Sequence, residues 1–227
     1  MSKAPVQAPV QAPDQAKARA QVRARLIARL DGSFERAPAR PRPGGALRER
    51  GDYDLNPDYR PPGPLTPAAV LVPLIEHAGG LTVLLTQRTD HLNDHAGQVS
   101  FPGGKIDDTD ADAVEAALRE THEEVGIEPA RVEVVGRLDD YVTGTGFTIT
   151  PVVGLLAPGF AVIPDPFEVA DVFEVPLAFF LDPANHHRES RVWKGRERHF
   201  YVMPYEDRYI WGATAGMLVN LYDALKD

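Results

Sequence analysis

Three glutamates near the middle of the chain are spaced for joint chemistry. Glu120, Glu123 and Glu124 stand at positions i, i+3 and i+4, so a helix would bring their carboxylates to one face. Like charges repel at that distance unless a cation lies between them, and carboxylate oxygens are ligands that hard divalent cations prefer. The spacing predicts a metal site on a helix, with Glu120 and Glu124 as the main ligands and Glu123 completing the set.

The alternative is an ordinary solvated helix face, because glutamate favours helices and charged faces are common on them. The surrounding residues favour the site. A Pro-Gly-Gly loop at 102–104 lets the backbone approach a ligand closely. Asp112 and Glu115 have the spacing of a capping box, and Gly126 is a typical helix stop. The opposite face is mainly apolar and consists of Val114, Ala117, Leu118, Thr121 and Val125.

A calcium-binding loop is another interpretation of this acidic stretch, because Asp108, Asp110 and Asp112 alternate along the chain. Such a loop needs glycine at its sixth position and glutamate at its twelfth. Ala113 and Arg119 stand at those positions, so the sequence excludes this interpretation.

The stretch ending in REthEEvGI resembles the signature of the Nudix hydrolases, in which a glycine and then an acidic residue precede REuxEExGu, where u is aliphatic. The fixed positions of the second half hold Arg119, Glu120, Thr121, Glu123, Glu124, Gly126 and Ile127. The usual count would put the glycine and the acidic residue at Lys105 and Ala111, whereas Gly104 and Asp110 lie one residue earlier. This extra residue, with Asp in place of Glu, resembles one branch of the family, the coenzyme A pyrophosphatases. Asp110 is expected to orient the loop.

An upstream segment also resembles that branch, whose motif is LLTxR(S/A)xxxRxxxGxxxFPGG. The chain reads LLTQRT from Leu84, followed by Gly97 and by FPGG from Phe101, with the spacing intact. Thr89 stands where Ser or Ala is expected, and Asn93 stands where Arg is expected.

Two later segments complete the resemblance. Residues 168–177 resemble EVxxVFxxPL, and residues 211–216, WGATAG, resemble WGxTAG. Four motifs in this order span about residues 66–220. The resemblance implies an α/β fold, the Nudix α/β/α sandwich with a mixed sheet and a loop-helix-loop, in residues 65–227.

The resemblance implies a metal-dependent hydrolase that cleaves the pyrophosphate bond of coenzyme A or its thioesters. The products would be 3′,5′-ADP and 4′-phosphopantetheine or its acyl form. Mg²⁺ or Mn²⁺ would bind the phosphate oxygens as a Lewis acid and lower the pKa of a bound water. The catalytic candidates are Glu120, Glu123, Glu124 and Glu168.

Five residues have more specific expected roles. Glu168 follows a Pro-Asp-Pro loop and is the candidate general base, although it could equally be a surface loop residue. Arg88 could bind a phosphate with two hydrogen bonds. By resemblance, the backbone of Gly103 or Gly104 supplies a carbonyl ligand. Arg119 lies four residues before Glu123 and is expected to hold it in position rather than to take part in the chemistry.

Two other functions stay open. A Nudix pyrophosphatase for ADP-ribose, NADH or a dinucleotide is slightly favoured by Thr89 and Asn93. A non-catalytic nucleotide sensor is the other, although the intact REthEE motif argues against it. A basic cluster could receive the nucleotide or form a solvated hairpin; it consists of Arg188, Arg191, Lys194, Arg196 and Arg198.

Residues 1–64 are expected to form an arm separate from the catalytic domain at 65–227. Residues 4–13 form a proline-rich repeat, residues 14–30 predict a basic amphipathic helix, and residues 37–64 predict a linker or extended arm.

Composition limits the partners. The net charge is −9, which opposes binding to a polyanion. The apolar stripe on the basic helix, formed by Val22, Leu26 and Leu30, is narrow, which also argues against nucleic-acid or membrane binding. We expect this helix to pack on its own domain or on a second subunit, which leaves a homo-oligomer open. The absence of cysteine excludes a disulfide framework and a cysteine nucleophile. No apolar run approaches the roughly 20 residues of a membrane span, so we expect a cytoplasmic enzyme with a small-molecule substrate of the coenzyme A type.

Alternation and turn residues predict the elements of the domain. Strands are expected at 68–76, 81–88, 131–141 and 148–156, a hairpin at 191–203, and helices at 113–125 and 214–225.

Overall fold

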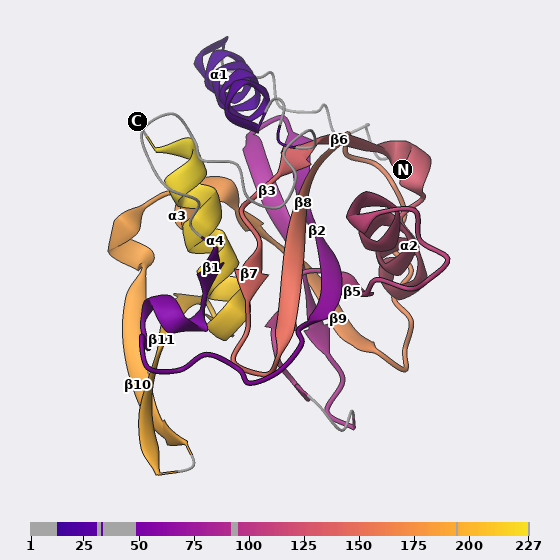
Figure 1. Cartoon of the computed structure of the whole chain (residues 1–227). Helices are drawn as coiled ribbons and strands as arrows, with labels where there is room; N and C mark the ends of the chain where they lie inside the picture. The colour runs from indigo at the N-terminus through magenta and orange to yellow at the C-terminus, as the bar shows by residue number, and fades with distance from the viewer. Residues whose placement is uncertain (1–12, 31–32, 34–48, 92–94, 194, 227) are drawn as a thin grey trace, which may run out of the picture.

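A computed structural model describes residues 13–30, 33, 49–91, 95–193 and 195–226 (Figure 1). Asn93, Lys194 and most of the proline-rich repeat lie outside this part. The helices are α1 (Pro13–Leu30), α2 (Ala113–Val125), α3 (Leu177–Phe180) and α4 (Gly212–Leu225), with short 3₁₀ turns η1 (Asp52–Asp54), η2 (Pro129–Arg131) and η3 (Pro183–Asn185). The strands are β1 (Arg50–Gly51), β2 (Thr66–His77), β3 (Gly80–Arg88), β4 (Val99–Ser100), β5 (Gly103–Lys105), β6 (Val132–Arg137), β7 (Tyr141–Val142), β8 (Phe147–Leu156), β9 (Val169–Pro176), β10 (His187–Trp193), β11 (Arg196–Tyr205) and β12 (Arg208–Trp211).

A mixed sheet forms the centre of the described part. Its main path runs β1-β7-β8-β2-β3-β4, with β5 also paired to β2, β6 to β8 and β9 to β3. β2 and β8 are parallel over ten residue pairs, from Thr66 opposite Phe147 to Ile75 opposite Leu156. A separate three-stranded sheet, β10-β11-β12, extends to one side (Figure 1).

Helices cover both faces of the central sheet. Successive side chains of β2 point to opposite faces, and both sets are apolar and buried. Ala69 and Leu71 belong to the apolar cluster beneath α2, whereas Val70, Val72 and Leu74 belong to the cluster that contains α4. Figure 1 shows α2 and α4 on opposite sides of the strands. The predicted α/β/α sandwich with a mixed sheet is therefore confirmed.

The strand predictions need correction in several places, since β1, β4, β5, β9 and β12 were not predicted. The expected strand at 131–141 is divided into β6 and β7, and its pairing with β8 shifts register between Val134 and Gly136. β9 was not predicted as a strand, because its sequence VADVFEVP mixes acidic and proline residues with apolar ones. In the structure, Val169 and Val175 are the buried residues of this strand.

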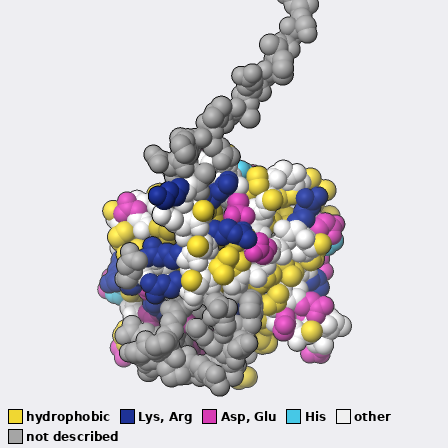
Figure 2. Space-filling view, turned by 90° about the horizontal axis from the view of Figure 1, so that it is seen from above, with side chains coloured by type: hydrophobic (Ala, Val, Ile, Leu, Met, Phe, Trp, Pro, Cys, Tyr) yellow, Lys and Arg dark blue, Asp and Glu magenta, His cyan; other side chains and the backbone are white. Residues whose placement is uncertain are grey.

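The N-terminal region is in contact with the domain. Leu26 and Leu30 of α1 are buried, and Arg23 binds Glu76 at 2.9 Å and Glu133 at 2.7 Å. On the face seen in Figure 2, coloured Lys and Arg side chains lie among acidic and apolar ones. Within the described residues, no helix is long and apolar enough to cross a bilayer.

Candidate active site

The acidic helix α2 begins and ends where its capping residues place it. Asp112 adopts an extended conformation, and its Oδ1 accepts hydrogen bonds from the amides of Val114 at 2.8 Å and Glu115 at 3.0 Å. The carboxylate of Glu115 returns to the amide of Ala111, one residue earlier than in a standard capping box. Gly126 ends the helix with φ 72°.

Glu124 is buried, which helix periodicity alone did not predict. Its side chain is only 5% exposed. The amide of Gly103 donates to its Oε2 at 3.1 Å, and Arg88 Nη1 lies 3.7 Å from its Oε1. Burial raises the pKa of Glu124 to about 8, because the Gly103 amide and Arg88 offset the lost hydration only in part. The nearby carboxylates of Glu168 and Glu120 raise it further.

Glu120 lies against the glycine loop. A Cβ atom on residue 104 would fall 2.5 Å from Glu120 Oε2, closer than real Cβ atoms come. Gly103 has φ +152°, and its own Cβ would fall 2.4 Å from the carbonyl oxygen of Ala69. A side chain at 103 would collide with the β2 backbone, and a side chain at 104 would displace the Glu120 carboxylate from its place beside the loop.

Arg119 connects the carboxylates. Its Nε and Nη2 donate to the two oxygens of Asp110, each at 2.9 Å, and Nη2 also donates to the carbonyl of Lys105 at 3.3 Å. Its Nη1 donates to Glu120 Oε1 at 2.9 Å and to Glu123 Oε2 at 3.1 Å. Arg119 lowers the pKa of Asp110 to about 2 by hydrogen bonding to its charged form. The predicted pairing of Arg119 with Glu123 is confirmed, and the loop-orienting contact of Asp110 goes through the same arginine.

The residues of this site are suited to a divalent cation. Among the described residues, no three acidic or histidine side chains already form a ready-made metal-binding group. Glu123 is 56% exposed and turned to Arg119, whereas Glu120 is half-buried and Glu124 is buried. Glu124 still lacks a fully compensating charge, because Arg88 is beyond hydrogen-bond distance. Carboxylate oxygens whose negative charge is not fully compensated are the ligands that Mg²⁺ or a similar ion would bind.

Glu168 is brought to this site by a loop anchored on both sides. The amide of Asp165 donates to the carbonyl of Glu124 at 2.8 Å. The amide of Thr89 donates to the carbonyl of Glu168 at 3.0 Å, and the Thr89 hydroxyl donates to the carbonyl of Phe167 at 2.9 Å. The Glu168 carboxylate is close enough to raise the pKa of both Glu120 and Glu124. Thr89, one of the two departures from the upstream motif, thus fixes the loop that carries Glu168.

A cavity of about 550 Å³ opens beside the glycine loop, which is within the size range of small-molecule sites. Arg88, Gly103 and Gly104 are among the residues that line it. Other lining residues come from β2, β4, the turn between β4 and β5, the 143–145 loop, β8, β12 and α4, among them Phe101, Thr143, Thr145, Phe147, Ile149, Trp211, Thr214 and Met217. Asp52 also lines it and was missed, because it lies in the stretch predicted as a linker and has no motif around it.

Comparison with known proteins identifies a family match in the part of the chain that contains α2 and the glycine loop. Residues 65–194 match the NUDIX domain family. The chain belongs to the Nudix family. NudL of Escherichia coli K12, described as an uncharacterized Nudix hydrolase, is 46% identical over 155 residues, which cover 68% of this chain and 80% of NudL. Nudix hydrolases act on pyrophosphate bonds and generally depend on a divalent metal, so the chain is a hydrolase of this class.

Solved Nudix structures resemble parts of the chain. An Ap4A hydrolase of C. elegans in a binary complex is 23% identical with a TM-score of 0.43, covering 49% of this chain and 80% of the hydrolase. The NUDIX domain of NrtR from Shewanella oneidensis, complexed with ADP ribose, is 25% identical with a TM-score of 0.40, covering 55% and 82%.

Replacing Arg119 of the Nudix helix by Lys is expected to lower kcat/KM by about 10- to 100-fold, in the range seen when residues that orient metal ligands are lost. A lysine cannot form the two parallel bonds to Asp110 while also holding Glu120 and Glu123. Steady-state kinetics at saturating Mg²⁺ would measure the loss. Arg131→Lys, on the exposed η2 turn, is the matched control, and equal activity of the two variants would contradict the role given to Arg119.

Proposed function

We propose that the chain is a coenzyme A pyrophosphatase that uses Mg²⁺ or Mn²⁺. The observation that supports this most is the convergence of the branch motifs on one cavity. Arg88 from LLTQR, Gly103 and Gly104 from FPGG, and Trp211 from WGATAG all line it. The Thr214 hydroxyl of the last motif donates to the carbonyl of Val99 at 3.0 Å, which ties α4 to the strand just before FPGG.

The residues around Glu120 and Glu124 would handle the diphosphate. A bound divalent cation would neutralise phosphate oxygens and favour ionisation of a water molecule. Glu120 and Glu124, with Glu123 beside them and a carbonyl of the glycine loop, would hold it. Arg88 lines the cavity, and among the described residues its Nε has no hydrogen-bond partner, so the guanidinium has a donor to offer a phosphate oxygen.

Glu168 would act as the general base. Its carboxylate would take a proton from the attacking water while that water bonds to one phosphorus. The P–O–P linkage then breaks, and the other phosphate leaves as a phosphomonoester. Burial of the site by α2 and the glycine loop makes these charges act more strongly than they would in water.

The rest of the cavity has a mixed character that suits a nucleotide with a long polar and apolar arm. Phe101, Phe147, Ile149 and Met217 supply apolar walls, and Trp211 supplies an aromatic face. The Thr89 hydroxyl fixes the Glu168 loop, which explains this departure from the motif without calling for another substrate.

Incubation with coenzyme A and Mg²⁺ is expected to give 3′,5′-ADP and 4′-phosphopantetheine, identified by mass. We expect kcat/KM for coenzyme A to exceed that for ADP-ribose, NADH and a dinucleotide by at least about tenfold, equivalent to 1.4 kcal/mol. A Glu124→Gln preparation controls for contaminating hydrolases. Equal or faster turnover of ADP-ribose or NADH would favour the broader Nudix alternative, and nucleotide binding without any turnover would favour a sensor.

A further inference from the structure

A short N-terminal segment, residues 50–59, is fastened to the loop that closes one side of the cavity. β1 pairs in parallel with β7, placing Arg50 opposite Tyr141 and Gly51 opposite Val142. This segment precedes the residues that match the NUDIX domain.

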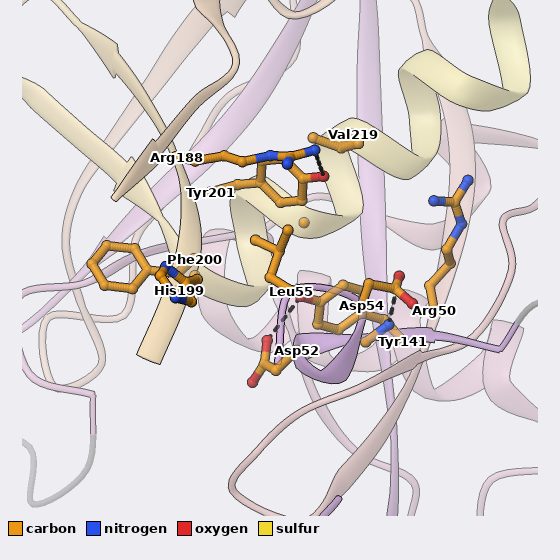
Figure 3. A pocket seen from close by; sticks show the side chains of 13 residues that line it. Arg50, Asp52, Asp54, Leu55, Tyr141, Arg188, His199, Phe200, Tyr201 and Val219 are labelled. Atoms are coloured by element: carbon orange, nitrogen blue, oxygen red, sulfur yellow. Dashed lines mark hydrogen bonds between the residues drawn. The ribbon is translucent and has the colours of Figure 1, made fainter. Parts of the chain in front are cut away.

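Asp52 makes the central contact of this segment. Its Oδ1 accepts a hydrogen bond from the Tyr141 hydroxyl at 2.8 Å, and its Oδ2 accepts one from the Gly144 amide at 2.6 Å. Figure 3 shows the Asp52 and Tyr141 side chains joined at the edge of a second, smaller cavity, which Asp52 and Gly212 share with the larger one. A carboxylate withdrawn from water needs such donors, so the two bonds hold Asp52 and the loop in one arrangement.

Tyr59 and Asn56 hold the same segment from the other end. The Tyr59 hydroxyl donates to the Gly144 carbonyl at 2.9 Å, and a Cβ on Gly144 would fall 2.5 Å from the Tyr59 ring. The Arg198 guanidinium lies 3.2 Å from the centre of that ring. Asn56 exchanges two hydrogen bonds with the backbone of His199, at 2.8 and 2.9 Å.

The WGATAG motif takes part in the same arrangement. A Cβ on Gly216 would fall 2.4 Å from the Tyr141 hydroxyl oxygen, so the motif's last glycine leaves room for Tyr141 to reach Asp52. The contacts therefore run from α4 through Tyr141 and Asp52 to Gly144.

The loop held in this way carries side chains that line the large cavity. Thr143 and Thr145 line the large cavity, and their hydroxyls are 2.9 Å apart. The Thr143 hydroxyl also accepts from the amide of Phe147, another lining residue, at 3.0 Å. Releasing Gly144 would therefore move three groups of the cavity wall while leaving α2 and the glycine loop in place.

We infer that Asp52 is a positioning residue that fixes the 143–147 wall of the cavity for binding the part of the nucleotide beyond the diphosphate. This inference rests on the proposed function, because it takes that cavity as the substrate site. Asp52 acts through Gly144 and Tyr141, so its loss should affect substrate binding far more than the hydrolytic step.

Asp52→Ala is expected to raise KM by at least about tenfold and to change kcat by less than about threefold, because it leaves the Gly144 amide without its buried partner. Asp52→Asn keeps an oxygen for the Gly144 amide and should restore KM to within about threefold of the unchanged protein. Asp54→Ala is the matched control, since this exposed carboxylate in the same turn accepts from the Gly51 amide at 3.3 Å rather than from the 143–147 wall, and its loss should leave KM unchanged.

The kinetics are measured on the full chain with whichever of coenzyme A, ADP-ribose and NADH it hydrolyses fastest, so failure of the substrate assignment is separate from failure of this inference. The role of Asp52 would be overturned if the KM of Asp52→Ala equalled that of Asp54→Ala. It would also be overturned if the kcat of Asp52→Ala fell by as large a factor as its KM rose. If Asp52→Ala does not fold, Tyr59→Phe tests the same loop by removing the bond to the Gly144 carbonyl. A raised KM with unchanged kcat would support the inference, and an unchanged KM would overturn it.

Discussion

Glu124→Gln and Glu120→Gln are each expected to lower kcat by at least about 100-fold, the scale on which loss of one preorganised charge in an active site is felt. Each change removes a negative charge from the proposed metal site but keeps the size of the side chain. Glutamine at 124 can still accept from the Gly103 amide, and glutamine at 120 still fits against Gly104. Steady-state turnover of coenzyme A with Mg²⁺ or Mn²⁺ would measure the loss.

The matched control for this pair is Glu128→Gln. Glu128 lies just after the same helix, its side chain is 64% exposed, and its carboxylate lies 3.3 Å from the His122 ring nitrogen. It should keep full activity, and circular dichroism should show all three variants folded. Full activity of either Glu120→Gln or Glu124→Gln with metal supplied would refute the assignment of these carboxylates to metal. Chelation should abolish turnover of the unchanged protein, and added Mg²⁺ should restore it.

Helix α2 was predicted from sequence with its limits intact, because its ends depend on local chemistry. Asp112 and Gly126 determine where the helix starts and stops through contacts within a few residues, and the structure has the helix at 113–125 as expected. The same local argument gave the contact of Arg119 with Glu123, four residues apart.

Burial of Glu124 could not be predicted in the same way, because it depends on residues distant in the sequence. Periodicity placed the apolar residues on one face and the acids on the other. The structure instead puts the Glu124 side chain against the Gly103 amide and Arg88, which belong to β5 and β3. Only the folded sheet brings those strands to the helix, so the sequence could give the residues of the site but not their charge environment.

The N-terminal segment illustrates the other limit. Its proline and glycine content predicted a linker, yet Asp52, Asn56 and Tyr59 all bind parts of the domain more than 80 residues away. Nothing within the segment indicates these partners, because all three bonds are made with the backbone of a distant loop or strand, and the further bond of Asp52 is made with the distant Tyr141 side chain. The separation of an arm at 1–64 from a domain at 65–227 stays a prediction.

Glu124→Gln is also expected to stabilise the protein in the absence of metal, and more so at high pH. Burial raises the pKa of Glu124 to about 8 in the folded chain, whereas an unfolded glutamate titrates near 4.3. Between these values the folded chain holds a proton that the unfolded chain has lost. The free energy of unfolding contributed by Glu124 therefore falls as pH rises from about 4.5 to about 8, and stays low above that. Glutamine carries no such proton and removes this loss.

Denaturant unfolding with chelator present would measure the difference between the two proteins at pH 5 and pH 9. At pH 5 Glu124→Gln should be more stable by only about 1 kcal/mol, and at pH 9 by roughly 2–5 kcal/mol, at 1.36 kcal/mol per pKa unit. Saturating Mg²⁺ should stabilise the unchanged protein and have little effect on the variant, because a bound ion compensates the carboxylate. A stability difference that does not grow with pH would show that ionisation of Glu124 does not lower the free energy of unfolding. A carboxylate that lowers stability until a cation binds serves catalysis rather than folding. Glu124→Gln should therefore lower kcat while it raises the free energy of unfolding.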